Sequence, residues 1–390
     1  MKRVLAGPKS AAILAAVAVG AALAAAFGVF GASGAEPRTG PLAVRPGLER
    51  PPNAYVRGGA MYALNGKRSA LGAPVSGALM GPLAPVAVAS PDGKAVVYSS
   101  WRERRPVDAG ASFSEQGIEN GQPLGTPSLR LHEDDGRDYL LARGAYSAAW
   151  RSDGALAFVR GAEADFRAGR VYRGDVVVRE RVHGPDVVWT SEPARYVVYA
   201  WAGRRLLFYR LGPGERLELL IAEGPGNVRP LTDGSAIALS PDGRRLAVLS
   251  QDGTSVRVLE LASGRELAWL DVTTATPPLR WVGYSGSWVG EHVVAPASAG
   301  LAVFRVGAKA LELEQVLGLD HAEFPAGVQE PRFDDETANE IVATADVPPA
   351  AGRAAVSFFL QCDRIARTCE RGEPAPAKEW LRLVAGGGQR

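Results

Sequence analysis

The chain has 390 residues, of which 46% are apolar and 22% charged, with 46 glycines, 28 prolines and only 2 cysteines. This composition is typical of a folded protein with many turns, and it excludes a disordered chain, a collagen-like repeat and a small protein held by many disulfides. Because 44 basic groups nearly balance 42 acidic ones, the positive field of a nucleic-acid-binding protein is absent, and no nucleic-acid partner is expected.

The N-terminus has the pattern of an export signal. Lys2, Arg3 and Lys9 precede an uncharged run, 10–35, whose core of 20 residues, 11–30, contains only Ala, Val, Leu, Ile, Gly and Phe. This core is long enough to span a bilayer, whereas the small residues at 33–35 suit a signal peptidase, and a buried core helix fits the basic flank less well. We therefore predict that residues 1–35 are a cleaved signal peptide or an uncleaved anchor helix that places the rest of the chain outside the cytoplasm.

A proline-rich segment, residues 36–52, follows, and a glycine-rich segment, residues 385–390, ends the chain. Prolines at this density remove backbone donors and hold a chain extended, so residues 36–52 are expected to be a linker. The folded domain is therefore predicted to span residues 53–384, with 385–390 as a flexible tail.

The middle of the chain contains an internal repeat. The segment 86–99, VAVASPDGKAVVYS, recurs as AIALSPDGRRLAVLS at 236–250, and weaker copies lie at 147–159 and 187–199. Two more copies, 279–294 and 331–343, keep the apolar runs and lose the turn sequence. The six units are 39 to 61 residues apart, which is the size of a propeller blade.

Each clear copy places a Ser-Pro-Asp-Gly or Ser-Asp-Gly turn between two short apolar runs. Pro presets φ, Asp caps its own backbone, and Gly adopts the left-handed conformation. The runs are too short for helices and lack a 3.6-residue period, so they are predicted to be strands, and two more strand-like runs complete several units. We interpret the turn residues as structural rather than as metal-binding or catalytic: Asp92, Gly93, Asp153, Gly154, Asp242 and Gly243.

These repeats resemble the β-propeller repeats of the TolB family, also called WD40-like or PD40 repeats, whose signature is an apolar strand, S-P-D-G-(K/R) and a second apolar strand. Residues 90–94 and 240–244 match fully, 151–154 match in part, and the other units match by pattern only. Together with the six units and their strand-like runs, the resemblance predicts an all-β, six-bladed β-propeller of four-stranded blades, here preceded by the signal or anchor helix. The resemblance also implies protein partners. It does not imply an activity.

Ring closure is expected to join the two ends of the chain. The run 60–64 precedes the first full blade, and we expect it to pair in the last blade beside 354–360 or 380–384.

Cys362 and Cys369 close a short loop near the C-terminal end. In an exported protein without further cysteines, such a pair is expected to be a disulfide rather than a metal site.

The sequence contains no complete catalytic motif. The run GYSGS at 283–287 has its second Gly one position too early for a nucleophile elbow, and metalloprotease, phosphate-binding and dinucleotide motifs are absent. The acidic run 132–138, HEDDGRD, lacks the spacing of a calcium loop and is predicted to be a hairpin turn. No cofactor is expected, and His292, in a predicted strand, is the candidate ligand if a metal occupies the central channel.

The polar segment between Trp101 and Ser128 lengthens one repeat. Long loops on rigid scaffolds are often functional, although a disordered loop without function is the alternative. Its candidate partner-binding residues are Arg102, Arg104, Arg105, Phe113 and Glu119.

We therefore predict an exported, non-catalytic propeller that binds a protein partner in the cell envelope. It would be anchored in the membrane facing outward, or periplasmic or extracellular after cleavage. Two alternatives stay open: a propeller enzyme of the lactonase or lyase type with a metal in the central channel, and an extracytoplasmic sensor domain.

Overall fold

The structure is a computed structural model, and it describes residues 42–49, 54–57, 60–62, 67–73, 75, 85–101, 118–119, 122–123, 127–165, 170–212, 216–280, 282–283, 285–298, 300–319, 324, 328–334, 337–347, 356–376 and 381–386. The expected signal or anchor, residues 1–35, lies outside these residues. Within the described ranges the regular elements are all strands. These ranges contain no helix long and apolar enough to cross a membrane.

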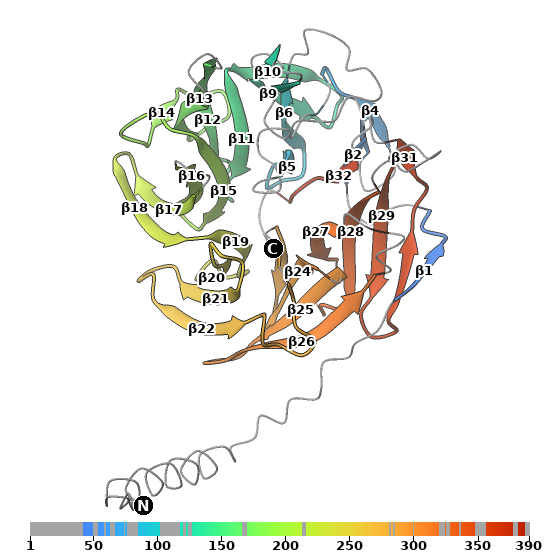
Figure 1. Ribbon diagram of the computed structural model, residues 1–390. Coiled ribbons are helices and arrows are strands. Elements are labelled where there is room, and N and C mark those ends of the chain that lie inside the picture. The colour runs from blue at the N-terminus through green and yellow to red at the C-terminus, as the bar shows by residue number, and fades with distance from the viewer. Residues whose placement is uncertain are drawn as a thin grey trace, which may run out of the picture. The chain divides into compact units, whose positions relative to one another are not determined.

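The strands of residues 38–390 form seven successive blades around a central axis (Figure 1). From the innermost strand outward, blade one consists of β32 (Leu381–Leu383), β2 (Tyr55–Arg57), β3 (Ala60–Tyr62) and β4 (Arg68–Ala70); blade two of β5 (Ala87–Ala89), β6 (Ala95–Trp101), β9 (Pro127–Glu133) and β10 (Asp138–Arg143); blade three of β11 (Ala145–Trp150), β12 (Leu156–Asp165), β13 (Arg170–Arg179) and β14 (Val187–Val188); blade four of β15 (Tyr196–Ala202), β16 (Arg205–Leu211), β17 (Leu217–Gly224) and β18 (Asn227–Asp233).

The remaining blades follow in chain order. Blade five consists of β19 (Ser235–Leu239), β20 (Arg245–Leu249), β21 (Ser255–Glu260) and β22 (Glu266–Asp271); blade six of β23 (Ser287–Val289), β24 (His292–Ala297), β25 (Gly300–Val306) and β26 (Leu311–Gly318); blade seven of β27 (Val328–Phe333), β28 (Glu340–Val347), β29 (Val356–Asp363), β30 (Thr368–Arg371) and β1 (Ala43–Pro46), with β31 (Ala375–Pro376) beside β29. A separate hairpin joins β7 (Ile118–Glu119) to β8 (Gln122–Pro123).

The two middle strands of the large blades contain the most buried side chains of the fold. Phe158 in β12, Phe208 in β16 and Phe304 in β25 are fully buried, because a middle strand is covered by the neighbouring blade on each face. Burying one such side chain stabilises the fold by about 2 to 3 kcal/mol.

The all-β propeller class is confirmed, but the prediction of six blades is wrong, because the ring has seven. The additional blade is blade one, which combines the C-terminal strand β32 with the N-terminal strands β2, β3 and β4. Each of its strands is only three residues long. Its innermost and second strands come from opposite ends of the chain, so no turn sequence marks their connection.

The two ends of the chain do pair, but through residues 55–57 and not through the predicted run 60–64. Val56 in β2 is opposite Arg382 in β32, whereas β3, which starts the run predicted to close the ring, pairs with β2 and β4. Part of the expected linker is a strand as well: Ala43–Pro46 pairs in parallel with β30. At the other end, Ala385, predicted to begin a flexible tail, exchanges backbone hydrogen bonds with β5.

Candidate functional site

The Ser-Pro-Asp-Gly turns have the geometry expected of structural turns. Between β5 and β6, Asp92 Oδ1 accepts hydrogen bonds from Ser90 Oγ at 2.6 Å and from the backbone N–H of Lys94 at 3.1 Å. Gly93 has a φ of 71°, which a residue with a side chain rarely adopts. The turn at Ser240, with Asp242 and Gly243, repeats these contacts between β19 and β20.

The turn between β11 and β12 uses an arginine instead of the serine. Asp153 Oδ1 accepts a hydrogen bond from Arg151 Nε at 2.7 Å, and Gly154 has a φ of 91°. Arg151 Nη2 donates to Glu180, and its guanidinium lies 5.0 Å from the ring centre of Trp201 in blade four. Arg151 therefore connects this turn to the neighbouring blade, a role that the sequence pattern did not reveal.

A groove of about 570 Å³ lies where the turns of blades two and three meet. Four connections on the same side of the ring form it, β5–β6 and β9–β10 of blade two and β11–β12 and β13–β14 of blade three, because in an antiparallel blade the first and third turns lie at one end. Its apolar side chains include Leu131, Trp150 and Val182. The indole Nε1–H of Trp150 donates to Val88 O at 3.2 Å, which fixes the ring at the base of the turn.

The charges that line this groove are mainly negative. Four acidic and two basic residues line the groove. The acidic residues are Asp92, Glu133, Asp134 and Asp153, and the basic residues are Lys94 and Arg137. The hydrogen bond from Ser90 lowers the pKa of Asp92, and the one from Arg151 lowers the pKa of Asp153, so both carboxylates are ionised at neutral pH. Arg137 pairs with Glu133 at 2.6 Å, so the groove is left with an excess of negative charge.

The acidic run 132–138 forms the β9–β10 hairpin turn, and its last carboxylate is part of a buried network. Asp138 accepts hydrogen bonds from the Tyr98 hydroxyl and from Arg130 Nε, each at 2.8 Å. Burial and the Asp138 carboxylate raise the pKa of Tyr98. His132, also buried, has its Nδ1 3.3 Å from Asp138 Oδ2. A Cβ on Gly72 would lie 3.0 Å or closer to these side chains, so blade one packs directly on this network.

His292, the candidate metal ligand, is not on an innermost strand. It lies on β24, the second strand of blade six, where Nε2 is 3.1 Å from Glu314 Oε2. Arg364, in the β29–β30 turn of blade seven, lies 3.4 Å from the same carboxylate oxygen. His292, Glu314 and Arg364 therefore connect blades six and seven, and within the described ranges no group of three or more His, Cys, Asp or Glu is placed to hold a metal.

The predicted partner-binding loop falls almost entirely outside the described residues. Arg102, Arg104, Arg105 and Phe113 are not among them, and Glu119 is placed only by its backbone in β7. The loop leaves β6 at Trp101, the end opposite the turn that contains Asp92. It therefore starts on the opposite side of the ring from the groove.

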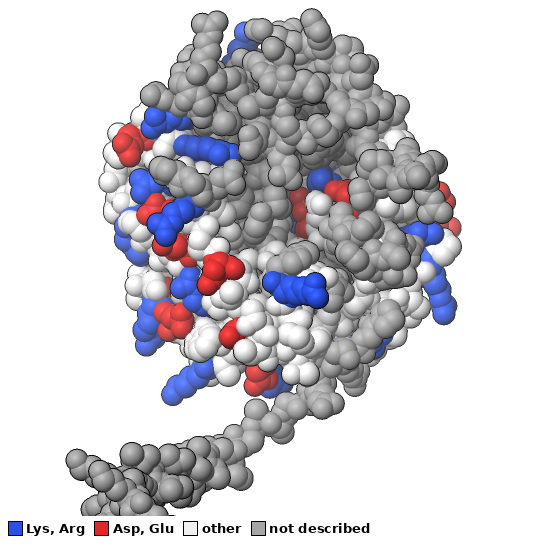
Figure 2. Space-filling model, in the orientation of Figure 1, with Lys and Arg blue, Asp and Glu red and all other residues white. Residues whose placement is uncertain are grey.

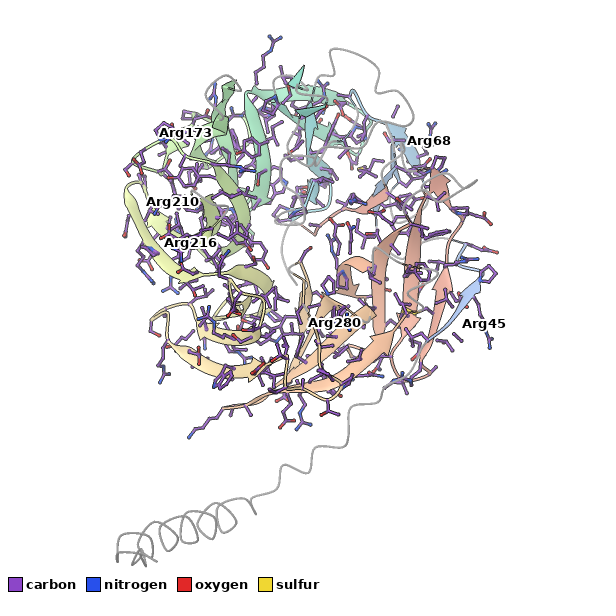
Figure 3. The ribbon with its side chains drawn as sticks, viewed as in Figure 1. Arg45, Arg68, Arg173, Arg210, Arg216 and Arg280 are labelled. Atoms are coloured by element: carbon purple, nitrogen blue, oxygen red, sulfur yellow. A yellow bond between two sulfur atoms is a disulfide. The ribbon has the colours of Figure 1, made fainter. Side chains whose placement is uncertain are left out.

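Arginines on several blades face the viewer in Figure 3, where Arg173, Arg210 and Arg216 follow one another along blades three and four. Their charges are partly compensated: Arg210 pairs with Glu218 at 2.5 Å, and Arg173 Nη2 donates to Pro193 O. Figure 2 likewise shows basic and acidic side chains intermixed over the described part of this side. These arginines form no continuous basic patch.

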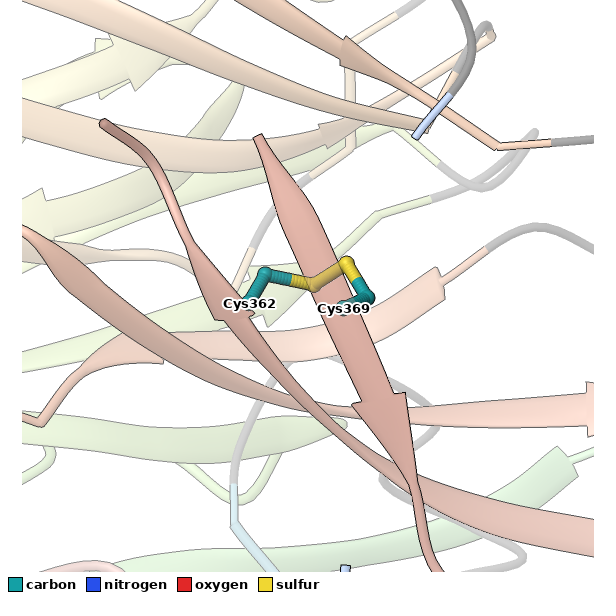
Figure 4. The surroundings of a disulfide bond; sticks show 2 residues. All are labelled: Cys362 and Cys369. Carbon is teal, nitrogen blue, oxygen red and sulfur yellow. A yellow bond between two sulfur atoms is a disulfide. The ribbon is translucent and has the colours of Figure 1, made fainter. Parts of the chain in front are cut away.

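Cys362 and Cys369 lie opposite each other on β29 and β30, with their sulfur atoms at the disulfide distance of 1.98 Å (Figure 4). The expected bond is therefore present, and it joins two adjacent strands at the outer part of blade seven.

No protein-family model matches the chain, and no curated protein matches its sequence. The resemblance to the TolB family is therefore still an interpretation of the turn sequences. Solved propeller structures are similar at low identity. They include the acylaminoacyl peptidase of Pyrococcus horikoshii (12% identity, TM-score 0.44), the β-propeller domain of the Trilobed protease from Pyrococcus furiosus (10%, 0.44) and the Cps50 (Swd1) β-propeller domain of Myceliophteria thermophila (9%, 0.44).

These matches cover 77%, 77% and 74% of this chain, and 46%, 83% and 86% of the respective structures. The chain thus spans less than half the length of the peptidase. One of these structures is a peptidase, whereas the Cps50 (Swd1) structure is described only as a β-propeller domain. At this level of similarity the matches assign no activity to this chain.

Proposed function

We propose that this protein is an extracytoplasmic β-propeller that acts as a non-catalytic, protein-binding module of the cell envelope, and that the groove between blades two and three is its docking surface. The observation that carries the proposal is the combination of excess carboxylates and an apolar base in one groove. A basic segment of a partner protein complements both features. The disulfide between Cys362 and Cys369 supports an oxidising compartment.

The groove is suited to docking because its walls are rigid. Asp92 and Asp153 are each held by hydrogen bonds within their own turns, so their charges need no ordering when a partner arrives. Ionised groups with fixed positions favour fast, salt-dependent association.

The test uses a photo-crosslinking amino acid at Ser152, which lines the groove, and a control position at Thr254, in a turn on the other side of the ring. We expect an adduct with one envelope protein from position 152 and none from position 254. Asp134→Lys should abolish this adduct, because it reverses a charge in the groove, whereas Glu266→Lys on the outer strand β22 should not. Equal crosslinking from position 152 with and without Asp134→Lys would contradict the proposal. A metal ion bound in stoichiometric amount to the purified protein would favour the enzyme alternative.

A further inference from the structure

The inner edge of blade seven contains an unusual glutamate. Glu330 lies on β27, the strand nearest the axis in this blade (Figure 1), at a point where the pairing with β28 shifts between Gln329 and Arg332. Its φ is 50°, in the left-handed region that residues with side chains rarely adopt. Bulges and such backbone conformations concentrate at ligand sites, where they direct a side chain.

One carboxylate oxygen of Glu330, Oε2, is buried without a hydrogen-bond partner among the described residues. The residue is 8% exposed, and its Oε2 makes no hydrogen bond to any part of the chain that the structure describes. A buried carboxylate is strongly unfavourable unless a donor or a positive charge compensates it. Within the described ranges, Oε2 therefore lacks a hydrogen-bond donor.

The same strand contains a guanidinium that forms no ion pair with this carboxylate. Arg332 is two residues further along β27, and its Nη1 donates one hydrogen bond, to Val384 O at 2.8 Å. Burial lowers the pKa of Arg332, and the negative charge of Glu330 opposes this effect. Among the ion pairs of the described residues, none joins Glu330 to Arg332.

We propose that Glu330 and Arg332 bind a small zwitterion of the α-amino acid class at the inner edge of blade seven. The ligand's ammonium group would donate to Glu330 Oε2, and its carboxylate would accept from the remaining N–H groups of Arg332. A ligand with one charge would satisfy only one of these side chains, whereas an amino acid offers both charges a few bonds apart. The site is independent of the groove, which lies at the turns of blades two and three.

The first experiment compares matched ligands on the unmodified protein with its disulfide intact. Calorimetric titration with the proteinogenic amino acids should identify at least one that binds. Its carboxamide, which lacks the negative charge, and its N-acetyl derivative, which lacks the positive charge, should each bind about tenfold more weakly or worse. Absence of binding by every amino acid at millimolar concentration, or equal binding of the derivatives, would overturn the proposal.

The second experiment separates a ligand site from a structural role. Glu330→Gln keeps the shape and removes the buried charge, so without ligand we expect an unchanged or higher melting temperature together with loss of amino acid binding. Glu370→Gln, on the exposed outer part of the same blade, should keep both properties, and Asp134→Lys in the groove should bind the amino acid normally. A large drop in the melting temperature of Glu330→Gln, or binding that survives in it, would rule out the assigned role.

Discussion

Val44 of β1 lies beside Cys369 of β30 in parallel register, and Cys369 is in turn disulfide-bonded to Cys362 of β29. The last strand added to blade seven thus rests on a covalently joined pair of strands. β1 comes from the segment expected to be a linker, so the disulfide fixes the edge to which the N-terminal part of the domain attaches.

Removing this disulfide should loosen that edge. For the double variant Cys362→Ser/Cys369→Ser we expect a loss of about 2 kcal/mol in the free energy of unfolding, because the bond closes a short loop in the unfolded chain. Urea denaturation of the oxidised protein and of the double variant measures this difference in the free energy of unfolding. Thiol titration of the exported protein should find no free thiol, and two reactive thiols per chain would show that the bond does not form in its compartment.

Ring closure should depend on the C-terminal strand. Truncation after residue 380 removes β32, which leaves β2 without its inner neighbour and exposes the buried Val56. We expect the melting temperature of the whole propeller to fall by several degrees, since closure removes the free edges of the ring. Truncation after Gly386 is the control and should melt like the full chain. An equal melting temperature for both truncations would mean that blade one contributes nothing to closure.

The sequence predicts the parts of this fold that depend on local chemistry. The turns at Asp92 and Asp242 follow from a few adjacent residues, and a pair of cysteines without other ligands predicts a disulfide. Blade one was missed because its strands are three residues long and come from both ends of the chain, so nothing local connects them. Glu330 was missed for a similar reason: its burial and its missing partner depend on the ring, and its repeat unit has lost the turn sequence.

The carboxylates of the 132–138 hairpin should differ sharply in their contribution to stability. Asp138 has a side chain only 7% exposed and bonds Tyr98 and Arg130, whereas Asp135 pairs with the exposed Arg137. We expect Asp138→Ala to cost about 3 kcal/mol, because it leaves Arg130 without its buried counter-charge, and Asp135→Ala to cost less than about 1 kcal/mol. Denaturation curves of the two variants decide this. Similar losses for both would mean that the hairpin behaves as a unit without a buried network.

The acid sensitivity of the propeller should depend partly on its turns. Hydrogen bonds from Ser250 and Thr254 lower the pKa of Asp252 to about 2. Because the folded pKa is below the unfolded one of about 3.9, this contribution is complete above about pH 4 and is lost as the pH falls toward 2. In melting experiments across this range, Asp252→Asn should show a shallower pH dependence than the unmodified protein. An equal pH dependence of the variant and the unmodified protein would mean that this turn does not contribute to the acid sensitivity.

The loop 102–128 starts from β6 on the side of the ring opposite the groove, and one pair of variants distinguishes these two candidate contact sites. Replacement of residues 104–126 by a short Gly-Ser turn should leave the fold intact, because β6 and β9 pair directly along their length and need only a turn to connect them. If the loop binds the partner, as the sequence predicts, this deletion abolishes co-purification while Asp134→Lys does not. If the groove binds it, the effects are reversed, and loss in both variants would indicate that the partner reaches around the outer edge of blade two. If neither variant changes co-purification, and both variants are folded as judged by their melting temperatures, both surfaces are excluded as the contact site.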